Sequence, residues 1–284
     1  MKKVTDIKQL KLIANSIRQD IIKMLERAGS GHPAGSLGMA DVFTALYFNV
    51  ANHNPKNPNW VDRDRIILSN GHICPVRYAC MAHTGYFPKM ELMTLRKIDS
   101  RLQGHPHNLS LPGVETSSGP LGQGVSQAMG FALAAKLDKK DYRIWLLMSD
   151  GEMQEGQTWE ALMFAAKYRL DNVTAIIDRN YIQISGNTED VMPLEPLKNK
   201  LMSFKWYVIE AEGHDFPSIL NALEESKTIK EMPTAVICHT IPGKGVSFME
   251  NKSEWHGKAP DFKQAKEALQ ELEEEKKRIL KEGW

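Results

Sequence analysis

Apolar residues recur at steps of three and four along the first stretch of the chain. Such spacing places them on one face and predicts a helix, which Thr5 or Asp6 can cap at its start. The helix ends at Gly29, because glycine favours the left-handed conformation at helix ends. Pro33 keeps His32 out of helical geometry, so we expect His32 on a turn. The apolar positions of this helix are Ile7, Leu10, Ala14, Ile17, Ile21 and Leu25.

A second apolar stretch predicts a helix over about 37–51, and the Asn- and Pro-rich residues 52–59 form a loop. Beyond this loop, short β-rich runs alternate with helical stretches, which is the order of βαβ units. We therefore expect one α/β domain, with a mostly parallel sheet flanked by helices on both faces. The β-rich runs are 65–69, 144–148, 173–177, 206–210 and 234–239.

The segment after residue 260 carries many Glu and Lys residues around one apolar seam. We expect residues 1–260 to form the domain and residues 261–284 to form a charged helix. A surface helix with one buried seam is the favoured interpretation, and a partner-binding helix is the alternative. The seam consists of Phe262, Ala265, Leu269, Leu272 and Ile279.

Charge and cysteine content narrow the possible partners and compartments. The 284 residues contain 36 Lys and Arg against 35 Asp and Glu, so no overall field would hold nucleic acid or an anionic membrane. Cys74, Cys80 and Cys238 form no C-x-x-C pair, which argues against a zinc site or a disulfide framework and favours a reducing compartment. The chain shows neither an apolar leader nor a membrane-spanning stretch, so we expect a cytoplasmic protein.

Polar residues directly follow two of the expected strands. Asp150 follows the run 144–148, and Asn180 lies thirty residues further on, just past the next strand. A crossover of that length makes the two strands neighbours, so both side chains face one crevice. Together with a main-chain oxygen such as that of Ile182, they provide hard ligands for Mg²⁺, which completes its octahedron with phosphates and water. The sequence therefore predicts a metal-bridged diphosphate; the alternative is a helix cap at Asp150 and a turn at Asn180.

Four histidines stand in turn-like contexts next to glycine or proline. Imidazole donates and accepts protons near neutral pH, which suits proton transfer and the polarisation of sugar hydroxyls or carbonyls. A satisfied structural histidine is the alternative at each position. The four are His32, His72, His105 and His256.

Glycine-rich segments permit close backbone approach without matching a dinucleotide or P-loop motif. Gly119 opens the run Gly-Pro-Leu-Gly-Gln-Gly, after which a helix of small residues extends to about Ala135. No expected strand precedes this run, and Gln127 stands where a dinucleotide motif needs its third glycine. Lys244 follows the last expected strand and faces either solvent or an anion.

In their order and spacing, these motifs resemble the diphosphate-binding domain of transketolases over residues 7–260. The resemblance includes the histidine-bearing turns, the run from Gly119, the Asp150 motif with Glu155, and Asn180. It implies a thiamin-diphosphate-binding fold and the transfer of a two-carbon ketol unit from a ketose to an aldose, as sugars or sugar phosphates. The cofactors implied are thiamin diphosphate and Mg²⁺, with Ca²⁺ or Mn²⁺ as alternatives.

The resemblance also implies roles for individual residues. The metal ligands are Asp150, Asn180 and the main-chain oxygen of Ile182, while Glu155 supports the site or contacts another subunit. The four histidines act as catalytic residues on the diphosphate, the donor sugar and its intermediates. Ser149 stands where the family usually has glycine, a small change that leaves cofactor binding intact. The residues expected at the cofactor are Gly119, Leu121, Gly151, Glu152, Asn180, Lys244, His72 and His256.

Full-length transketolases add a pyrimidine-binding domain, whose glutamate activates the cofactor, and a third domain. Because this chain ends at Trp284 after the charged helix, it resembles the N-terminal subunit of a split transketolase. We expect activity only with a C-terminal subunit that carries the pyrimidine-binding domain, in a heterotetramer built around a twofold axis. One alternative is the α subunit of a 2-oxo acid dehydrogenase, which lacks the histidine frames. The other is a non-catalytic paralogue, which the intact motifs disfavour.

Overall fold

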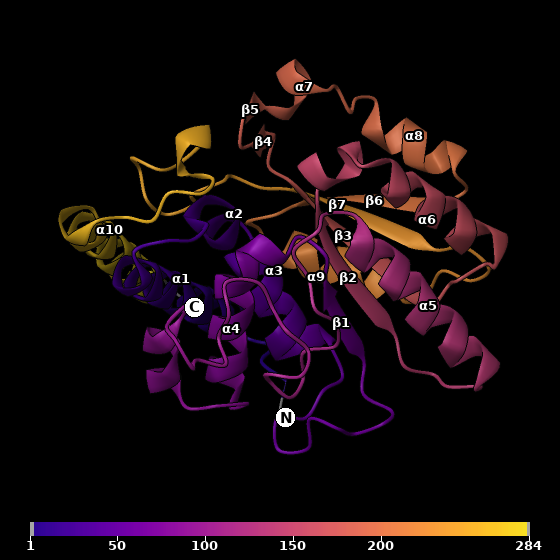
Figure 1. Cartoon of the computed structure of the whole chain (residues 1–284), viewed down its shortest axis with the longest axis horizontal. Helices are drawn as coiled ribbons and strands as arrows, with labels where there is room; N and C mark the ends of the chain where they lie inside the picture. Colours follow the sequence, from indigo (N-terminus) through magenta and orange to yellow (C-terminus); the bar gives the residue numbers. More distant parts are fainter. Residues whose placement is uncertain (1–2, 283–284) are drawn as a thin grey trace.

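A parallel sheet forms the centre of the molecule. The computed structural model describes residues 3–282, and its main strands lie in the order β1-β2-β3-β7-β6 (Figure 1). Every neighbouring pair in this sheet is parallel, so the predicted fold class is confirmed. Each strand lies within two residues of its predicted bounds. The bounds are β1 Arg65–Leu68, β2 Ile144–Ser149, β3 Val173–Arg179, β6 Tyr207–Glu212 and β7 Thr234–His239.

Helices cover both faces of this sheet, and alternate strand residues face opposite layers. In β2, Trp145 and Leu147 pack with the first layer, whereas Leu146 and Met148 pack with the second. Strands buried on both faces are typical of parallel sheets. The first layer contains α1 (Ile7–Ala28), α3 (Ala40–Ala45), α4 (Cys74–Thr84) and α9 (Phe216–Ser226). The second contains α5 (Gln123–Leu137), α6 (Gly156–Lys167) and α8 (Leu197–Ser203).

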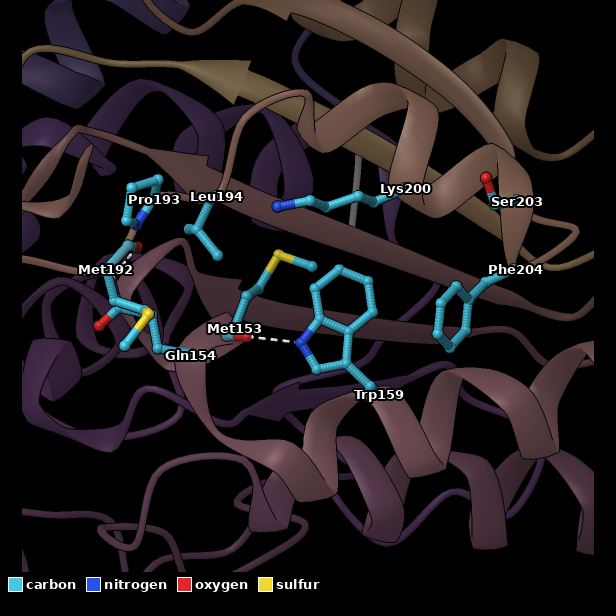
Figure 2. Close-up of a pocket in the computed structure, with 9 residues that line it drawn as sticks. All are labelled: Met153, Gln154, Trp159, Met192, Pro193, Leu194, Lys200, Ser203 and Phe204. Atoms are coloured by element: carbon cyan, nitrogen blue, oxygen red, sulfur yellow. Dashed lines mark hydrogen bonds between the residues drawn. The ribbon is translucent and has the colours of Figure 1, made fainter.

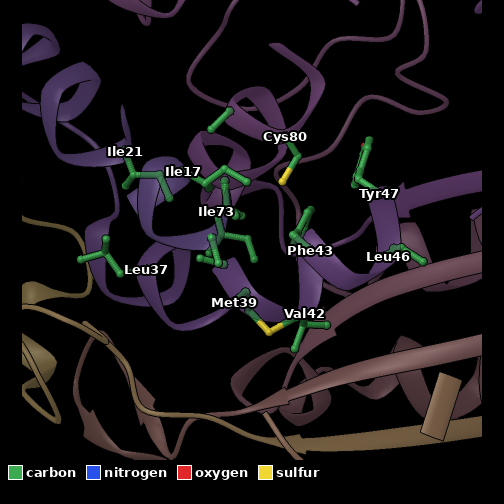
Figure 3. Packing of buried hydrophobic residues seen from close by; sticks show 14 of the residues in the cluster. Ile17, Ile21, Leu37, Met39, Val42, Phe43, Leu46, Tyr47, Ile73 and Cys80 are labelled. Atoms are coloured by element: carbon green, nitrogen blue, oxygen red, sulfur yellow. The ribbon is translucent and has the colours of Figure 1, made fainter. Parts of the chain in front are cut away.

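The larger of the two cores lies in the first layer. Figure 3 shows Ile17 and Ile21 of α1 packed near Ile73, with Phe43 of α3 beside them. These four side chains are completely buried. Burial of an aliphatic or aromatic side chain of this size stabilises the fold by about 1.5–3 kcal/mol. The helical periodicity of α1 is therefore explained by this core.

The first predicted helix is confirmed, and the second is only partly correct. Asp6 caps α1 by accepting a hydrogen bond from the Gln9 N–H at 3.2 Å, and Gly29 ends it with φ of 68°. The predicted helix over 37–51 instead comprises α2 (Pro33–Gly38), α3 and a π-helical turn over Leu46–Val50. The break follows Gly38, where a Cβ would lie 3.0 Å from the main-chain oxygen of Ile241. A close contact between distant segments therefore favours a residue without a side chain at position 38.

Two further elements complete the structure around the sheet. A hairpin of β4 (Ile182–Gln183) and β5 (Gly186–Asn187), followed by α7 (Thr188–Val191), was not predicted from the sequence. The charged tail forms α10 (Phe262–Lys281), which packs on α1, as in the Asn15 Nδ2 hydrogen bond to the Leu272 oxygen at 2.9 Å. Residues 1–2 and 283–284 of the predicted segments lie outside the described residues, and the division at residue 260 stays a prediction. None of the helices within 3–282 is long and apolar enough to cross a bilayer.

Candidate functional site

The carboxyl ends of β2 and β3 bring the two predicted metal-binding segments together. The strands are paired so that Ser149 lies beside Asp178, and the Asp150 N–H donates to the Asp178 main-chain oxygen at 3.1 Å. The neighbouring strands predicted from the thirty-residue crossover are therefore confirmed. Asp150 and Asn180 both follow these strand ends at the crevice where open α/β sheets bind ligands.

A cavity of about 420 Å³ opens at these strand ends. It gathers segments that are far apart in the sequence, from the turn before α2 to the loop after η5 (Ser253–Trp255). The predicted site residues that line it are His32, His72, His105, Gly119, Leu121, Gly151, Glu152, Asn180, Ile182 and His256, together with Ser149 and Glu155.

The four predicted histidines form one cluster. The ring centroids of His32 lie 5.1 Å from His72, 5.6 Å from His256 and 6.4 Å from His105. Burial, followed by the neighbouring His256, lowers the pKa of His32 to about 4, and burial holds the pKa of His72 well below its usual value. Burial also lowers the pKa of His105 and of His256. At neutral pH these rings are therefore uncharged, with one donor and one acceptor nitrogen each.

Asp150 is completely buried directly behind the cavity wall. Its Oδ1 accepts from the Gly151 N–H at 2.7 Å, and its Oδ2 accepts from the Tyr181 N–H at 2.8 Å and from Arg179 Nη1 at 3.0 Å. Burial raises the pKa of Asp150 to about 6 although all three donors oppose the shift. The carboxylate is thus held at a defined orientation and is charged at neutral pH.

Asn180 is held in a similar way at the end of β3. Its Nδ2 donates to Asp178 Oδ2 at 2.7 Å, which fixes the amide orientation, and its Oδ1 accepts from the Ile182 N–H at 3.0 Å. Asp178 is buried, and burial raises the pKa of this carboxyl to about 7. The sequence analysis assigned no role to Asp178, and the structure shows that this carboxyl orients Asn180.

The donor set at this position fits a small hard cation better than a transition metal. Within residues 3–282, no three His, Cys, Asp or Glu side chains are grouped so that they could hold a metal ion. A cation here would instead use the Asp150 carboxylate, the Asn180 amide oxygen and a main-chain oxygen, with its remaining positions filled by phosphate and water. That incomplete oxygen set is the kind that Mg²⁺ accepts with phosphate ligands.

Glu152 connects two loops at the other side of the cavity. Its Oε1 accepts from the Gly122 N–H at 2.6 Å and from the Ser69 hydroxyl, while its buried Oε2 has no hydrogen-bond partner. Burial raises the pKa of Glu152 to about 7. The unpartnered oxygen, like the unpartnered His32 Nδ1, leaves hydrogen-bonding capacity for a polar ligand.

Lys244 is a predicted cofactor-binding residue that the structure places outside the cavity. Lys244 does not line the cavity; its Nζ lies 3.7 Å from Glu250 Oε1, in a groove between α1 and α10. Its contact with the cofactor stays a prediction without support from this geometry.

Arg179 is completely buried beside Asp150. An arginine at the end of a strand expected to be buried was the available signal, because a buried charge needs buried partners.

Comparison with known proteins identifies the family. The family described as "Transketolase, thiamine diphosphate binding domain" matches residues 9–279. The chain therefore belongs to the transketolase family, as the resemblance of its motifs indicated. The match covers the sheet, the cavity and most of α10.

Relatives of two kinds are similar to this chain. An apulose-4-phosphate transketolase subunit from Phocaeicola vulgatus is 38% identical over 277 residues, which is 98% of each chain. The 6-deoxy-6-sulfo-D-fructose transketolase subunit SqwG of a Clostridium species is 41% identical over 262 residues, 92% of this chain and 95% of that one. The crystal structure of transketolase from Campylobacter jejuni has a TM-score of 0.89 at 33% identity. That match covers 97% of this chain and 46% of the other, so this chain spans about half the length of that transketolase.

Proposed function

We propose that this chain is the N-terminal subunit of a split transketolase, which transfers a two-carbon ketol unit from a ketose to an aldose. One observation carries the proposal: four histidines share a cavity with Asn180 and Ile182, and Asp150 is buried directly behind the wall of that cavity. The almost full-length similarity to two proteins named as transketolase subunits supports it.

The cofactors in this proposal are thiamin diphosphate and Mg²⁺, or Ca²⁺ or Mn²⁺ in its place. Thiamin diphosphate supplies the electron sink for breaking and forming the carbon–carbon bond. Asp150, Asn180 and the main-chain oxygen of Ile182 would hold the cation that bridges the diphosphate. Gly119 suits close approach of a ring, since it has no side chain and its φ of 150° is one that other residues rarely adopt.

The histidines provide the proton chemistry in this proposal. Their rings are uncharged at neutral pH, so each can donate to one oxygen and accept from another. The buried and unpartnered Nδ1 of His32 is such a group. We assign the four histidines to binding sugar hydroxyls and to moving the protons that are exchanged between hydroxyl and carbonyl oxygens.

The substrates proposed are sugar phosphates or related anionic sugars. The two similar subunits are named for a sugar phosphate and for a sulfo-sugar. The described cavity lining contains neither lysine nor arginine. The anionic end of the substrate would therefore be bound by the partner subunit, with its pyrimidine-binding domain.

An outward surface of the second helix layer favours self-association around a twofold axis. We define the α5–α6 face by the exposed apolar side chains on these helices: Ala134, Leu137, Met163 and Phe164. Leu137 and Met163 are 73% and 56% exposed. Large apolar side chains exposed on two packed helices mark an interaction surface, whereas the outer side of α5 nearer its start carries the polar residues Ser126 and Gln127. Glu155, exposed at the cavity edge where α6 begins, would lie near that contact.

We also propose a cytoplasmic location. Cys74, Cys80 and Cys238 are free and buried. Free thiols are typical of proteins in a reducing compartment.

The experiment that tests the function is a ketol-transfer assay on the purified chain. With thiamin diphosphate, Mg²⁺ and a panel of ketose donors and aldose acceptors, we expect no turnover by the chain alone. Turnover should appear when the C-terminal subunit is added, because half of the cofactor site is then supplied. Turnover by the chain when mass spectrometry detects no partner would refute the split-enzyme proposal.

A further inference from the structure

Arg179 is completely buried and occupies the centre of an ion-pair network that extends from Asp150 to the protein surface. Its Nη1 donates to Asp150 Oδ2 at 3.0 Å and to Thr188 Oγ1 at 3.1 Å. Its Nη2 donates to Glu189 Oε1 at 2.6 Å and to Glu195 Oε1 at 2.8 Å. Burial opposes the charge, but the hydrogen bonds to Glu189 and Glu195 outweigh it and raise the pKa of Arg179. One guanidinium therefore joins three carboxylates.

The outer carboxylates are themselves anchored to the chain after α7. Glu189 accepts from the Leu194 and Glu195 N–H groups at 3.2 and 3.1 Å, and Glu195 Oε2 accepts from the Leu197 N–H at 2.9 Å. Residues Met192, Pro193 and Leu194 form one wall of a hollow of about 390 Å³ (Figure 2). Glu189 and Glu195 thus hold Nη2 of Arg179, while Nη1 of the same guanidinium binds Asp150.

The opposite wall of this hollow begins directly after the metal-binding motif. Figure 2 shows Met153 and Gln154 facing Leu194 and Met192 across it. Gln154 Nε2 donates to the Met192 oxygen at 2.8 Å. The segment after α7 that holds Arg179 is therefore bonded to the turn over Gly151–Gln154. Asp150 directly precedes this turn and also accepts a hydrogen bond from Arg179.

The network distinguishes the two oxygens of Asp150. Oδ2 accepts two hydrogen bonds, from Arg179 and from the Tyr181 N–H, whereas Oδ1 accepts only that of Gly151. We propose that Arg179 is a positioning residue: it holds Oδ2 so that Oδ1 is the oxygen presented to the divalent cation. This inference rests on the proposed function, because it requires a cation at Asp150.

The local charges agree with this assignment. Asp150, Glu189 and Glu195 carry three negative charges against the single positive charge of Arg179. A divalent cation at Asp150 offsets this excess of negative charge. A planar guanidinium is suited to such a role because its donors are fixed in direction, which the flexible ammonium of lysine does not offer.

The test is a titration with Mn²⁺, followed by electron paramagnetic resonance of the free ion. The protein is the full chain assembled with its C-terminal subunit, in the presence of thiamin diphosphate. We expect Arg179→Met to weaken Mn²⁺ binding about 10–100-fold, the effect typical of removing a residue that orients a metal ligand. Arg179→Lys should weaken Mn²⁺ binding to an intermediate extent, since lysine keeps the positive charge but lacks the planar set of donors of the guanidinium.

Arg143→Met is the matched control. Arg143 is also a largely buried arginine, which donates to Thr174 Oγ1 and to the Ser226 oxygen, but it lies at the amino end of β2, away from the cavity. We expect it to lower stability and to leave Mn²⁺ affinity unchanged. Equal losses of affinity in Arg143→Met and Arg179→Met would assign the effect to general destabilisation and overturn the proposal.

Asp150→Asn separates failure of this inference from failure of the proposed function. If Asp150→Asn binds Mn²⁺ as the wild type does, no cation binds at Asp150 and both fail. If Asp150→Asn loses the ion while Arg179→Met keeps wild-type affinity, only the role of Arg179 is wrong. Should Arg179→Met not fold, wild-type affinity in both Arg179→Lys and the Glu189→Gln/Glu195→Gln double variant overturns the role.

Discussion

At the scale of single residues, burial decides the protonation state of the histidine cluster. The unfolded chain takes up a proton on His32 near pH 6.5, whereas the folded chain does so only near pH 4. The unfolded state therefore binds more protons in this window. It follows that the contribution of His32 to the free energy of unfolding decreases as the pH falls from 6.5 to 4.

We expect the His32 imidazole to remain neutral well below pH 6.5. Nitrogen-detected NMR titration of the imidazole rings in the full chain measures this directly, with the urea-unfolded chain as the reference. The folded ring should titrate near pH 4, because burial and the facing His256 ring both disfavour its charged form. A folded His32 that titrates with the unfolded reference would contradict the geometry of the cluster.

His105 gives a kinetic prediction at the same scale. Its ring lies beside Gly119 in the cavity lining, and its centroid is 6.4 Å from that of His32. We expect His105→Ala to lower kcat of the assembled enzyme about 10²–10⁴-fold, the usual range for loss of a group that transfers protons, with cofactor affinity retained. His107→Ala is the control, since His107 does not line the cavity and bonds to Ser110. Loss of cofactor with normal kcat at saturating cofactor would reverse the assignment.

At the scale of elements, Gly124 allows the start of α5 to pack closely against the end of β1. A Cβ on Gly124 would lie 2.6 Å from the Cα of Ser69, so the start of α5 touches the end of β1 directly. This contact positions the turn over Gly119–Gly122, which Glu152 also holds. Gly130 lies further along the same helix, and a Cβ added there would meet no other atom within 4 Å.

We expect opposite effects from two alanine substitutions in α5. Gly124→Ala should destabilise the chain by about 1–3 kcal/mol, because the extra methyl group overpacks a backbone contact. Gly130→Ala should stabilise it by up to about 1 kcal/mol, because alanine favours the helix interior. Urea unfolding of the full chain, monitored by circular dichroism, measures both. A tolerated Gly124→Ala would show that α5 can shift away from β1.

At the scale of the whole molecule, the α5–α6 face lies on the second helix layer, opposite the larger core (Figure 1). Phe164 and Tyr168 pack against each other there with ring centroids 4.5 Å apart, and Tyr168 is 46% exposed. An apolar patch of this kind marks an interaction surface. The face therefore provides a prediction for assembly rather than for catalysis.

We expect Met163→Glu to reduce self-association of the chain, measured by sedimentation velocity. A charge at this exposed position would have to be buried in the contact, which is unfavourable without a partner charge. Leu280→Glu is the control, because Leu280 is similarly exposed, at 53%, but lies near the end of α10. If Leu280→Glu dissociates the assembly and Met163→Glu does not, the contact lies elsewhere.

The sequence predicted the elements whose signals are local. The strands of the sheet and the limits of α1 follow from periodicity and end signals, and both match the structure closely. The helix over 37–51 was only partly correct, because the structure interrupts it after Gly38 and forms a π-helical turn over Leu46–Val50, which the apolar spacing did not indicate. The β4–β5 hairpin was missed because its strands contain only two residues each.

The candidate site shows the same division between local and distant causes. Asp150 and Asn180 could be paired from the sequence alone, since a crossover between parallel strands determines which ends meet. The sequence also determined the family, through short motifs in a fixed order. Which groups surround those motifs was decided by the tertiary structure. Arg179 meets Asp150, and Glu152 meets Gly122, only because loops from different strands close over one another, and burial then sets the charge that each group carries.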